Sequence, residues 1–280
     1  MPRLGKSGAG RLAARLVAPL GVILVAGCGG SSAAHHNRQG PHPPASTTSR
    51  LTATHFASQA QPPAPPTTTL HRLLAGQIPT RVPTAQHVVA LTFDAGADNA
   101  GAPKILATLA RTGATATFFM TGRWAELYPQ WARRIAAHYP IANHTFNHLD
   151  LLSLPPPEVT SQILMAGAAI QHVTGRAPAS LFRFPYGSSN TTTLALVNRL
   201  GYTAVGWTVD TLGWEGTSMG QSLASVAAHA LDHLEPGEII LMHVGANPQD
   251  HSTLDADALA AIITAIRAHG YRFVTLAEYF

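Results

Sequence analysis

The stretch Ile239-Ile240-Leu241-Met242-His243 holds four consecutive apolar residues followed by an imidazole. The apolar residues leave no polar face, which is typical of a strand that is buried on both sides within a parallel sheet. A second run, Val88-Val89-Ala90-Leu91-Thr92-Phe93, is built in a similar way and ends at Asp94. Two such strands predict an α/β fold in which functional side chains gather where the strands end.

Residues 87–280 alternate between short runs rich in β-branched and aromatic residues and longer stretches with helical periodicity. This alternation predicts a parallel sheet with right-handed crossovers, either a barrel or an open doubly wound sheet. The predicted strands are 88–93, 115–119, about 140–143, 181–184, 203–208, 238–243 and 271–274. The predicted helices are 103–112, 124–138, 158–173, 192–200, 223–234 and 254–269.

Acidic residues are distributed unevenly along the 280-residue chain. Residues 1–93 contain eight Lys and Arg but no Asp or Glu, so the net charge of +4 is a property of the N-terminal region. Residues 94–280 hold ten Lys and Arg against all fourteen acids. A nucleic-acid partner needs clustered basic side chains on the folded part, so we do not expect one.

The N-terminus has the pattern of an export signal. Basic residues at 3, 6, 11 and 15 precede the apolar run 16–25, which is shorter than the roughly 20 residues of a spanning helix. Val25-Ala26-Gly27-Cys28 resembles the bacterial lipobox, which implies cleavage before Cys28 and lipid on its sulfur. We predict a lipoprotein signal peptide over residues 1–27, with a plain signal peptide as the alternative. Cys28 is the only cysteine, so no disulfide can form within one chain.

Residues 28–86 are rich in Gly, Ser, Pro, Thr, Ala and His. Proline runs such as Gln61-Pro-Pro-Ala-Pro-Pro66 exclude helix and central strand. We predict a flexible tether that holds a domain over residues 87–280 away from the extracytoplasmic face of the membrane. We expect the protein to be a monomer.

Two imidazoles, His144 and His148, lie four residues apart and can face one metal ion from a helical turn or tight loop. Two histidines and a carboxylate are a common catalytic zinc set that leaves a position open for water. A second carboxylate can take the proton of that water, and His243 has a suitable reference pKa of about 6.5 for a general acid. The inventory suits metal-assisted hydrolysis of an amide or ester.

Five segments, in one order, resemble the motifs of the polysaccharide deacetylases, the NodB-homology enzymes of carbohydrate esterase family 4. The segments are Thr92-Phe93-Asp94, His144-x-x-x-His148, Arg183-x-Pro-Tyr-Gly187, Asp210 with Trp214, and Leu241-x-His243. The resemblance covers about residues 87–280 and implies a distorted (β/α)7 barrel. It also implies removal of N-acetyl groups from amino sugars of a cell-wall glycan such as peptidoglycan or a chitin-like polymer.

The resemblance assigns a role to each motif residue. Asp94 would be the general base, with Arg183 as its ion-pair partner. His144 and His148 would hold a divalent metal, usually zinc, with cobalt, nickel and manganese as alternatives. His243 would protonate the departing amine.

The remaining motif residues would bind the substrate. The backbone N–H of Tyr186 would donate to the tetrahedral oxyanion. Trp214 and Leu241 would line the pocket for the acetyl methyl group.

The chain departs from the family pattern at two positions. Ala95 stands where the family has an Asp that ligates the metal, and we expect Asp98 to replace it, with Asp94 or a water molecule as alternatives. Gly213 stands where the family has Asp before Trp, and we expect Asp210 to orient His243 or Arg183 instead.

These departures leave other functions open. A barrel that has lost full metal coordination could bind glycan without catalysis. The same machinery could also act as an amidase or esterase on another acyl group.

Overall fold

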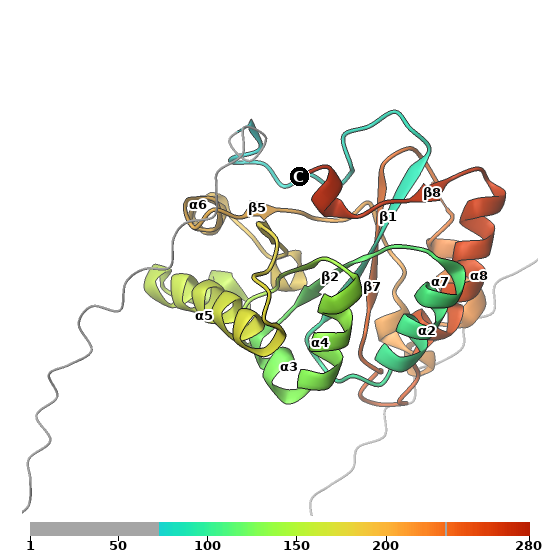
Figure 1. Cartoon of the computed structure of the whole chain (residues 1–280), viewed down its shortest axis with the longest axis horizontal. Helices are drawn as coiled ribbons and strands as arrows, with labels where there is room; N and C mark the ends of the chain where they lie inside the picture. Colours follow the sequence, from blue (N-terminus) through green and yellow to red (C-terminus); the bar gives the residue numbers. More distant parts are fainter. Residues whose placement is uncertain (1–72, 233) are drawn as a thin grey trace, which may run out of the picture. The chain divides into compact units, whose positions relative to one another are not determined.

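In the computed structural model, which describes residues 73–232 and 234–280, a parallel sheet forms the centre of the molecule (Figure 1). Its strands follow the order β5-β4-β3-β2-β1-β7-β6, and β8 pairs with β1. The strands are β1 (Val88–Ala95), β2 (Thr117–Met120), β3 (Ile141–Asn143), β4 (Leu181–Phe182), β5 (Thr203–Ala204), β6 (Val209–Asp210), β7 (Glu238–His243) and β8 (Arg272–Phe273). The ladders between these strands are parallel, as the alternation of the sequence predicts.

The short segment between β5 and β6 shows that this sheet is strongly curled. Residues 205–208 connect the strands at its two opposite ends, and such a segment reaches roughly 17 Å at most. Seven strands in a flat sheet would place the outer two about 29 Å apart. The sheet is therefore an open half-barrel, and the doubly wound alternative is wrong.

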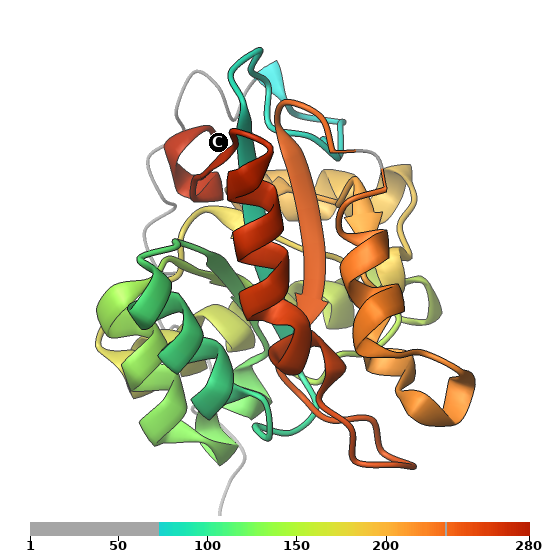
Figure 2. The ribbon, with the colours of Figure 1, turned by 90° about the vertical axis from the view of Figure 1, so that its right-hand side faces the viewer.

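Helices cover the outside of the half-barrel (Figure 1). They are α2 (Ala102–Thr112), α3 (Gly122–Leu127), α4 (Pro129–His138), α5 (Pro156–Thr174), α6 (Thr191–Arg199), α7 (Leu223–His229) and α8 (Leu254–Ala268). Short 3-10 turns lie at Leu151–Ser153, Pro185–Gly187, Gly213–Glu215, Thr217–Met219 and Leu276–Glu278. Figure 2 shows α8 lying along β7, with α2 and α7 packed on either side of it.

The core follows the two-residue period of β1, all of whose residues are buried. Val89, Leu91 and Phe93 belong to the large apolar cluster shared with the helices. Val88 and Ala90 belong to a second cluster on the other face of the sheet. The same alternation directs Asp94 to that second face, toward the inside of the half-barrel, and Ala95 to the helix-covered side.

Two predicted helices differ from the structure. The helix predicted over 124–138 is two helices, because Pro129 has no N–H to continue α3 and Tyr128 leaves the helical region at φ −125° and ψ 55°. The helix predicted over 223–234 ends at His229, after which the N–H of Leu231 bonds to Ala228 in a tight turn.

The segment before β1 packs on the domain. Val82 is buried, and its N–H donates to the Gly237 carbonyl over 2.7 Å. The N–H of Gly206 donates to the Pro79 carbonyl. The folded part therefore extends toward the N-terminus beyond residue 87, whereas the predicted signal peptide and most of the predicted tether lie outside the described residues. Among the helices that the structure describes, none is both long and apolar enough to cross a membrane.

Candidate active site

A buried ion pair lies inside the half-barrel. Arg183 is fully buried, and its Nη1 donates to Asp94 Oδ1 over 2.8 Å and to Thr92 Oγ1 over 2.9 Å. Its Nη2 donates to the Gly206 carbonyl, and the guanidinium stacks 4.0 Å from the centre of the Phe119 ring. Burial alone would raise the pKa of Asp94, but Arg183 and the nearby imidazoles lower it overall, so Asp94 is an ionised carboxylate at neutral pH.

His144 follows β3 and is held in one tautomer. Its Nδ1 lies 2.9 Å from the Arg183 carbonyl, which can only accept, so Nδ1 carries the proton. Nε2 therefore has a free lone pair. This atom is buried, has no hydrogen-bond partner among residues 73–232 and 234–280, and lies 3.4 Å from Asp94 Oδ2. A buried nitrogen of this kind is prepared to ligate a metal ion.

His148 lies against His144, with 4.7 Å between the ring centres. Burial and the neighbouring His144 lower the pKa of His148 to about 4, so its imidazole is neutral at neutral pH. The loop between them is held by helix α3, whose first N–H groups, those of Gly122 and Arg123, donate to the carbonyls of Thr145 and Phe146 over 3.0 Å. The two imidazoles fit a divalent metal ion as nitrogen ligands.

Asp98 does not join this pair. Its Oδ1 accepts the N–H groups of Ala100 (2.8 Å) and Ala246 (3.0 Å), which ties the loop after β1 to the loop after β7. Within residues 73–232 and 234–280, no three His, Cys, Asp or Glu side chains form a group that could hold a metal ion. Two imidazoles are therefore the nitrogen ligands that this part of the chain could offer a metal ion, and Ala95 is packed in the apolar cluster.

His243 lies beside Asp94 because the two residues are register partners on β7 and β1. Its backbone N–H donates to Asp255 Oδ2 over 2.8 Å, and its Nδ1 lies 3.6 Å from the same oxygen. Burial alone would lower the pKa of His243, but the carboxylates of Asp255, Asp94 and Asp210 raise it overall. The site thus holds a carboxylate suited to accept a proton and, next to it, an imidazole suited to donate one.

The other motif residues surround this centre. Asp210 accepts from the Leu212 N–H over 2.9 Å and from Trp214 Nε1 over 3.2 Å, so it fixes the loop that carries the indole. The Trp214 ring is half exposed, 6.3 Å from the His243 ring. Leu241 is buried two residues before His243 on β7, so its side chain points to the same face of the sheet.

Tyr186 borders the imidazole pair from the loop after β4. Its ring centre lies 4.7 Å from that of His148, and its backbone is left-handed at φ 59°. A non-glycine residue held in this region is uncommon and concentrates at functional sites. The next residue, Gly187, has no room for a side chain, because a Cβ there would lie 2.9 Å from the Trp207 ring.

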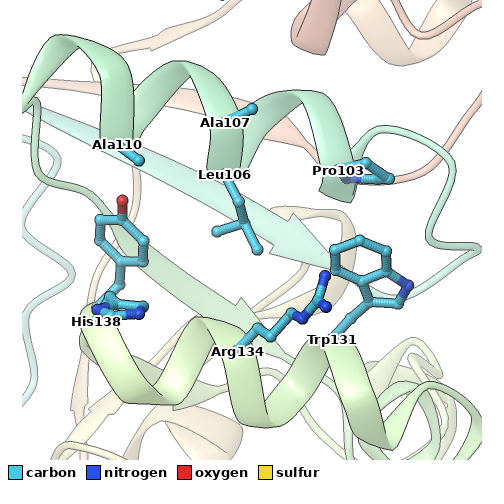
Figure 3. A pocket seen from close by; sticks show the side chains of 8 residues that line it. Pro103, Leu106, Ala107, Ala110, Trp131, Arg134 and His138 are labelled. Atoms are coloured by element: carbon cyan, nitrogen blue, oxygen red, sulfur yellow. The ribbon is translucent and has the colours of Figure 1, made fainter.

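A pocket of about 590 Å³ lies elsewhere, between α2 and α4 on the outside of the half-barrel (Figure 3). Leu106 and Trp131 project into it from the two helices, and Arg134 stacks on Trp131 at 5.0 Å. None of the five motifs contributes to its lining. The candidate active site is therefore the edge of the sheet, away from this pocket.

Comparisons with known proteins identify the family of this chain. Residues 81–205 match the family model "Polysaccharide deacetylase". A chitooligosaccharide deacetylase of Azorhizobium caulinodans is 34% identical over 200 residues, which cover 68% of this chain and 93% of the relative. The chain belongs to the polysaccharide deacetylase family. The family and the distorted (β/α)7 barrel that the five motifs imply are thus confirmed.

Solved structures in this deacetylase family share the fold. The Bc1960 peptidoglycan N-acetylglucosamine deacetylase is 34% identical, with a TM-score of 0.66 over 72% of this chain and 92% of that one. BA3943 of Bacillus anthracis, described as a family 4 carbohydrate esterase pseudoenzyme, is 25% identical, with a TM-score of 0.62 over 69% of this chain and 65% of that one. A mutant of BA3943 is described as having restored enzymatic activity.

Asp255 lies at the start of the helix predicted over 254–269 and is not among the predicted site residues. In the structure its carboxylate reaches the functional site through His243 and Thr211, whose Oγ1 donates to Asp255 Oδ1 over 2.6 Å. The sequence does contain one signal for Asp255. Gly213 stands where the family has an Asp, and the missing carboxylate suggests that another acidic residue takes its place.

Proposed function

We propose that this chain is a metal-dependent deacetylase that removes N-acetyl groups from the amino sugars of a cell-wall glycan. The adjacency of Asp94 and His243 at the ends of neighbouring strands carries the proposal. A base and an acid in register are what amide hydrolysis requires, and a buried imidazole nitrogen lies 3.4 Å from the base.

His144 and His148 would hold the metal, zinc in the first place, with cobalt, nickel or manganese as alternatives. When bound, the ion supplies a Lewis acid for the acetyl carbonyl and lowers the pKa of water. A site with two protein nitrogens would hold the ion less tightly than a site with three protein ligands.

The side chains of the site would divide the proton transfers. Asp94, kept ionised by Arg183, accepts the proton of the water that adds to the acetyl carbon. His243 then gives a proton to the sugar nitrogen as the carbon–nitrogen bond breaks, which leaves acetate and a free amine. The backbone N–H of Tyr186 is suited to the oxyanion, and Trp214 and Leu241 to the acetyl methyl group.

The names of the relatives support the substrate class. The relatives described above are named for chitooligosaccharide and for peptidoglycan N-acetylglucosamine. The lipobox-like Val25-Ala26-Gly27-Cys28 supports a protein that is exported and lipid-anchored, where such a glycan would be accessible. We therefore propose an acetylated glycan outside the cytoplasm as the substrate.

The test is acetate release by the full chain after loading with zinc, cobalt, nickel or manganese. The substrates are N-acetylglucosamine oligomers, peptidoglycan, and a panel of other amides and esters. We expect turnover on a glycan, its loss on chelation, and recovery when metal is returned. Asp94→Asn is the matched control for contaminating activity. Turnover confined to other acyl groups, or none with any metal, contradicts the proposal.

Ala95 favours a second candidate, a glycan-binding barrel without catalysis. The chain resembles the pseudoenzyme BA3943 in fold as well as the active relatives. Against it, Asp94, Arg183 and His243 are retained in a connected arrangement that binding alone does not need. Glycan binding that survives chelation, with no acetate released, would support this candidate.

A further inference from the structure

Asp255 is a buried carboxylate in the first turn of α8, and only 3% of it is exposed. A buried carboxylate without partners is costly. Its two oxygens bond across to other elements: Oδ1 accepts the Thr211 hydroxyl over 2.6 Å, and Oδ2 accepts the His243 N–H over 2.8 Å. The carboxylate therefore links α8 to the two strand ends that carry motif residues.

The orientation of His243 follows from its exposure. The side chain is 27% exposed, yet its Nδ1 atom is buried and has no hydrogen-bond partner among the described residues. The exposed part is consequently the rest of the ring, which includes Nε2. Nδ1 faces Asp255 Oδ2 at 3.6 Å, slightly beyond hydrogen-bond distance. Such contacts often tighten when substrate binds.

Gly213 provides the space for this carboxylate. A Cβ at position 213 would lie 2.2 Å from Asp255 Oδ1 and 2.5 Å from its Cγ, so no other residue fits beside Asp255. A side chain at 213 would thus start where the Asp255 carboxylate now lies. A carboxylate beside His243 can therefore come from position 255, as in this chain, or from position 213, but not from both at once.

We propose that Asp255 is the positioning residue of His243: its carboxylate accepts the Nδ1 proton and holds the ring with Nε2 toward the leaving nitrogen. The proposal rests on the proposed function. A carboxylate on one ring nitrogen fixes the tautomer and stabilises the imidazolium that donates from the other nitrogen. Asp210, expected from the sequence to orient His243 or Arg183, instead bonds to Leu212 and Trp214.

The kinetic test compares Asp255→Ala and Asp255→Asn with Asp257→Asn. Asp257 lies on the same helix, but its carboxylate bonds to Lys104 and Thr253, so this control removes an equal charge from the same helix end. We expect kcat to fall by about 10²-fold or more in both Asp255 variants, with KM within about twofold. We expect Asp257→Asn to stay within about twofold of the parent. Equal kcat in Asp255→Asn and the parent would overturn the proposal.

Moving the carboxylate from position 255 to position 213 distinguishes a positioning role from a general loss of structure. Gly213→Asp alone should lose activity, because the new side chain collides with Asp255. Gly213→Asp combined with Asp255→Ala places a carboxylate close to the same position. The new Cβ would still lie 2.9 Å from the backbone N of residue 255, so this variant needs a small backbone shift. We expect at least tenfold recovery over Asp255→Ala. A double variant with the same urea midpoint as Asp255→Ala but no higher activity would contradict the proposal.

A spectroscopic readout makes the proposal independent of the assay. In the full chain with ¹⁵N-labelled histidine, long-range ¹H–¹⁵N correlations report which nitrogen of neutral His243 carries the proton, with His243→Gln for assignment. We expect Nδ1–H in the parent and a loss of that preference in Asp255→Ala. An unchanged tautomer in Asp255→Ala overturns the role of Asp255. Absence of turnover in the parent overturns only the proposed function.

Discussion

At the scale of single residues, the Arg183 guanidinium and the Asp94 carboxylate neutralise each other inside the half-barrel. Arg183→Met keeps much of the volume but leaves Asp94 buried without its partner. We expect the free energy of unfolding to fall by about 3–5 kcal/mol at neutral pH in urea titrations. Arg123→Met, which removes an exposed side chain, is the control.

The same ion pair predicts how the loss of stability in Arg183→Met depends on pH. The pKa of Asp94 is lowered in the folded state, so its stabilising contribution is present above the unfolded pKa and is lost as pH falls through the folded one. The difference between the parent and Arg183→Met should therefore narrow below about pH 4. A difference that stays constant from neutral to acid pH would show that the ion pair does not cause it.

Glu238 should make the stability of the protein fall as pH rises, which is opposite to the effect of Asp94. Burial raises the pKa of this carboxyl from 4.5 to about 7, and its Oε1 has no hydrogen-bond partner in the described part of the chain. A raised folded pKa gives stability that is complete below the unfolded value and is lost as pH rises from 4.5 to about 7. We expect Glu238→Gln to remove this fall between pH 5 and 8 in urea titrations. Exposed Glu126→Gln is the control, and an unchanged slope in Glu238→Gln would contradict the prediction.

At the scale of elements, helix α3 supports the loop that carries the histidine pair. Gly122, its first residue, has no space for a side chain: a Cβ would lie 2.4 Å from the Phe146 ring. Gly122→Ala must displace Phe146, which lies between His144 and His148 in the chain. We expect a loss of about 1–3 kcal/mol in stability and weaker zinc binding by calorimetry. Wild-type zinc affinity in this variant would show that α3 does not hold the metal loop.

The periodicity of the sequence predicts where most helices and strands lie in the chain, but not which strands pair with one another in the sheet. The run 203–208 was predicted as one strand, whereas the structure has β5 at 203–204 and β6 at 209–210, paired to opposite ends of the sheet. An apolar run shows that residues are buried, but not which strands they pair with. Pro129 is visible in the sequence, and the break before α4 follows from it.

At the scale of the whole molecule, strand order explains why much of the site could be predicted. Asp94, Arg183 and His243 end or follow parallel strands, so any parallel sheet in this order brings them to one edge. The position of Asp255 could not be predicted this way, because its side chain reaches the site from a helix on the outside. Asp98 shows the opposite case. It is expected near the metal because it is close to Ala95 in sequence, but its carboxylate joins two loops instead.

The export prediction also belongs to this scale, because it concerns where the domain works. If Cys28 is the acylated residue, the full chain expressed in a bacterial host should incorporate labelled fatty acid and sediment with membranes. Cys28→Ser should lose the label and leave the membrane fraction, since the remaining apolar run is too short to span a bilayer. Ser32→Ala, four residues further on, is the control. A Cys28→Ser chain that still sediments and carries label would place the lipid anchor at another residue and contradict the prediction for Cys28.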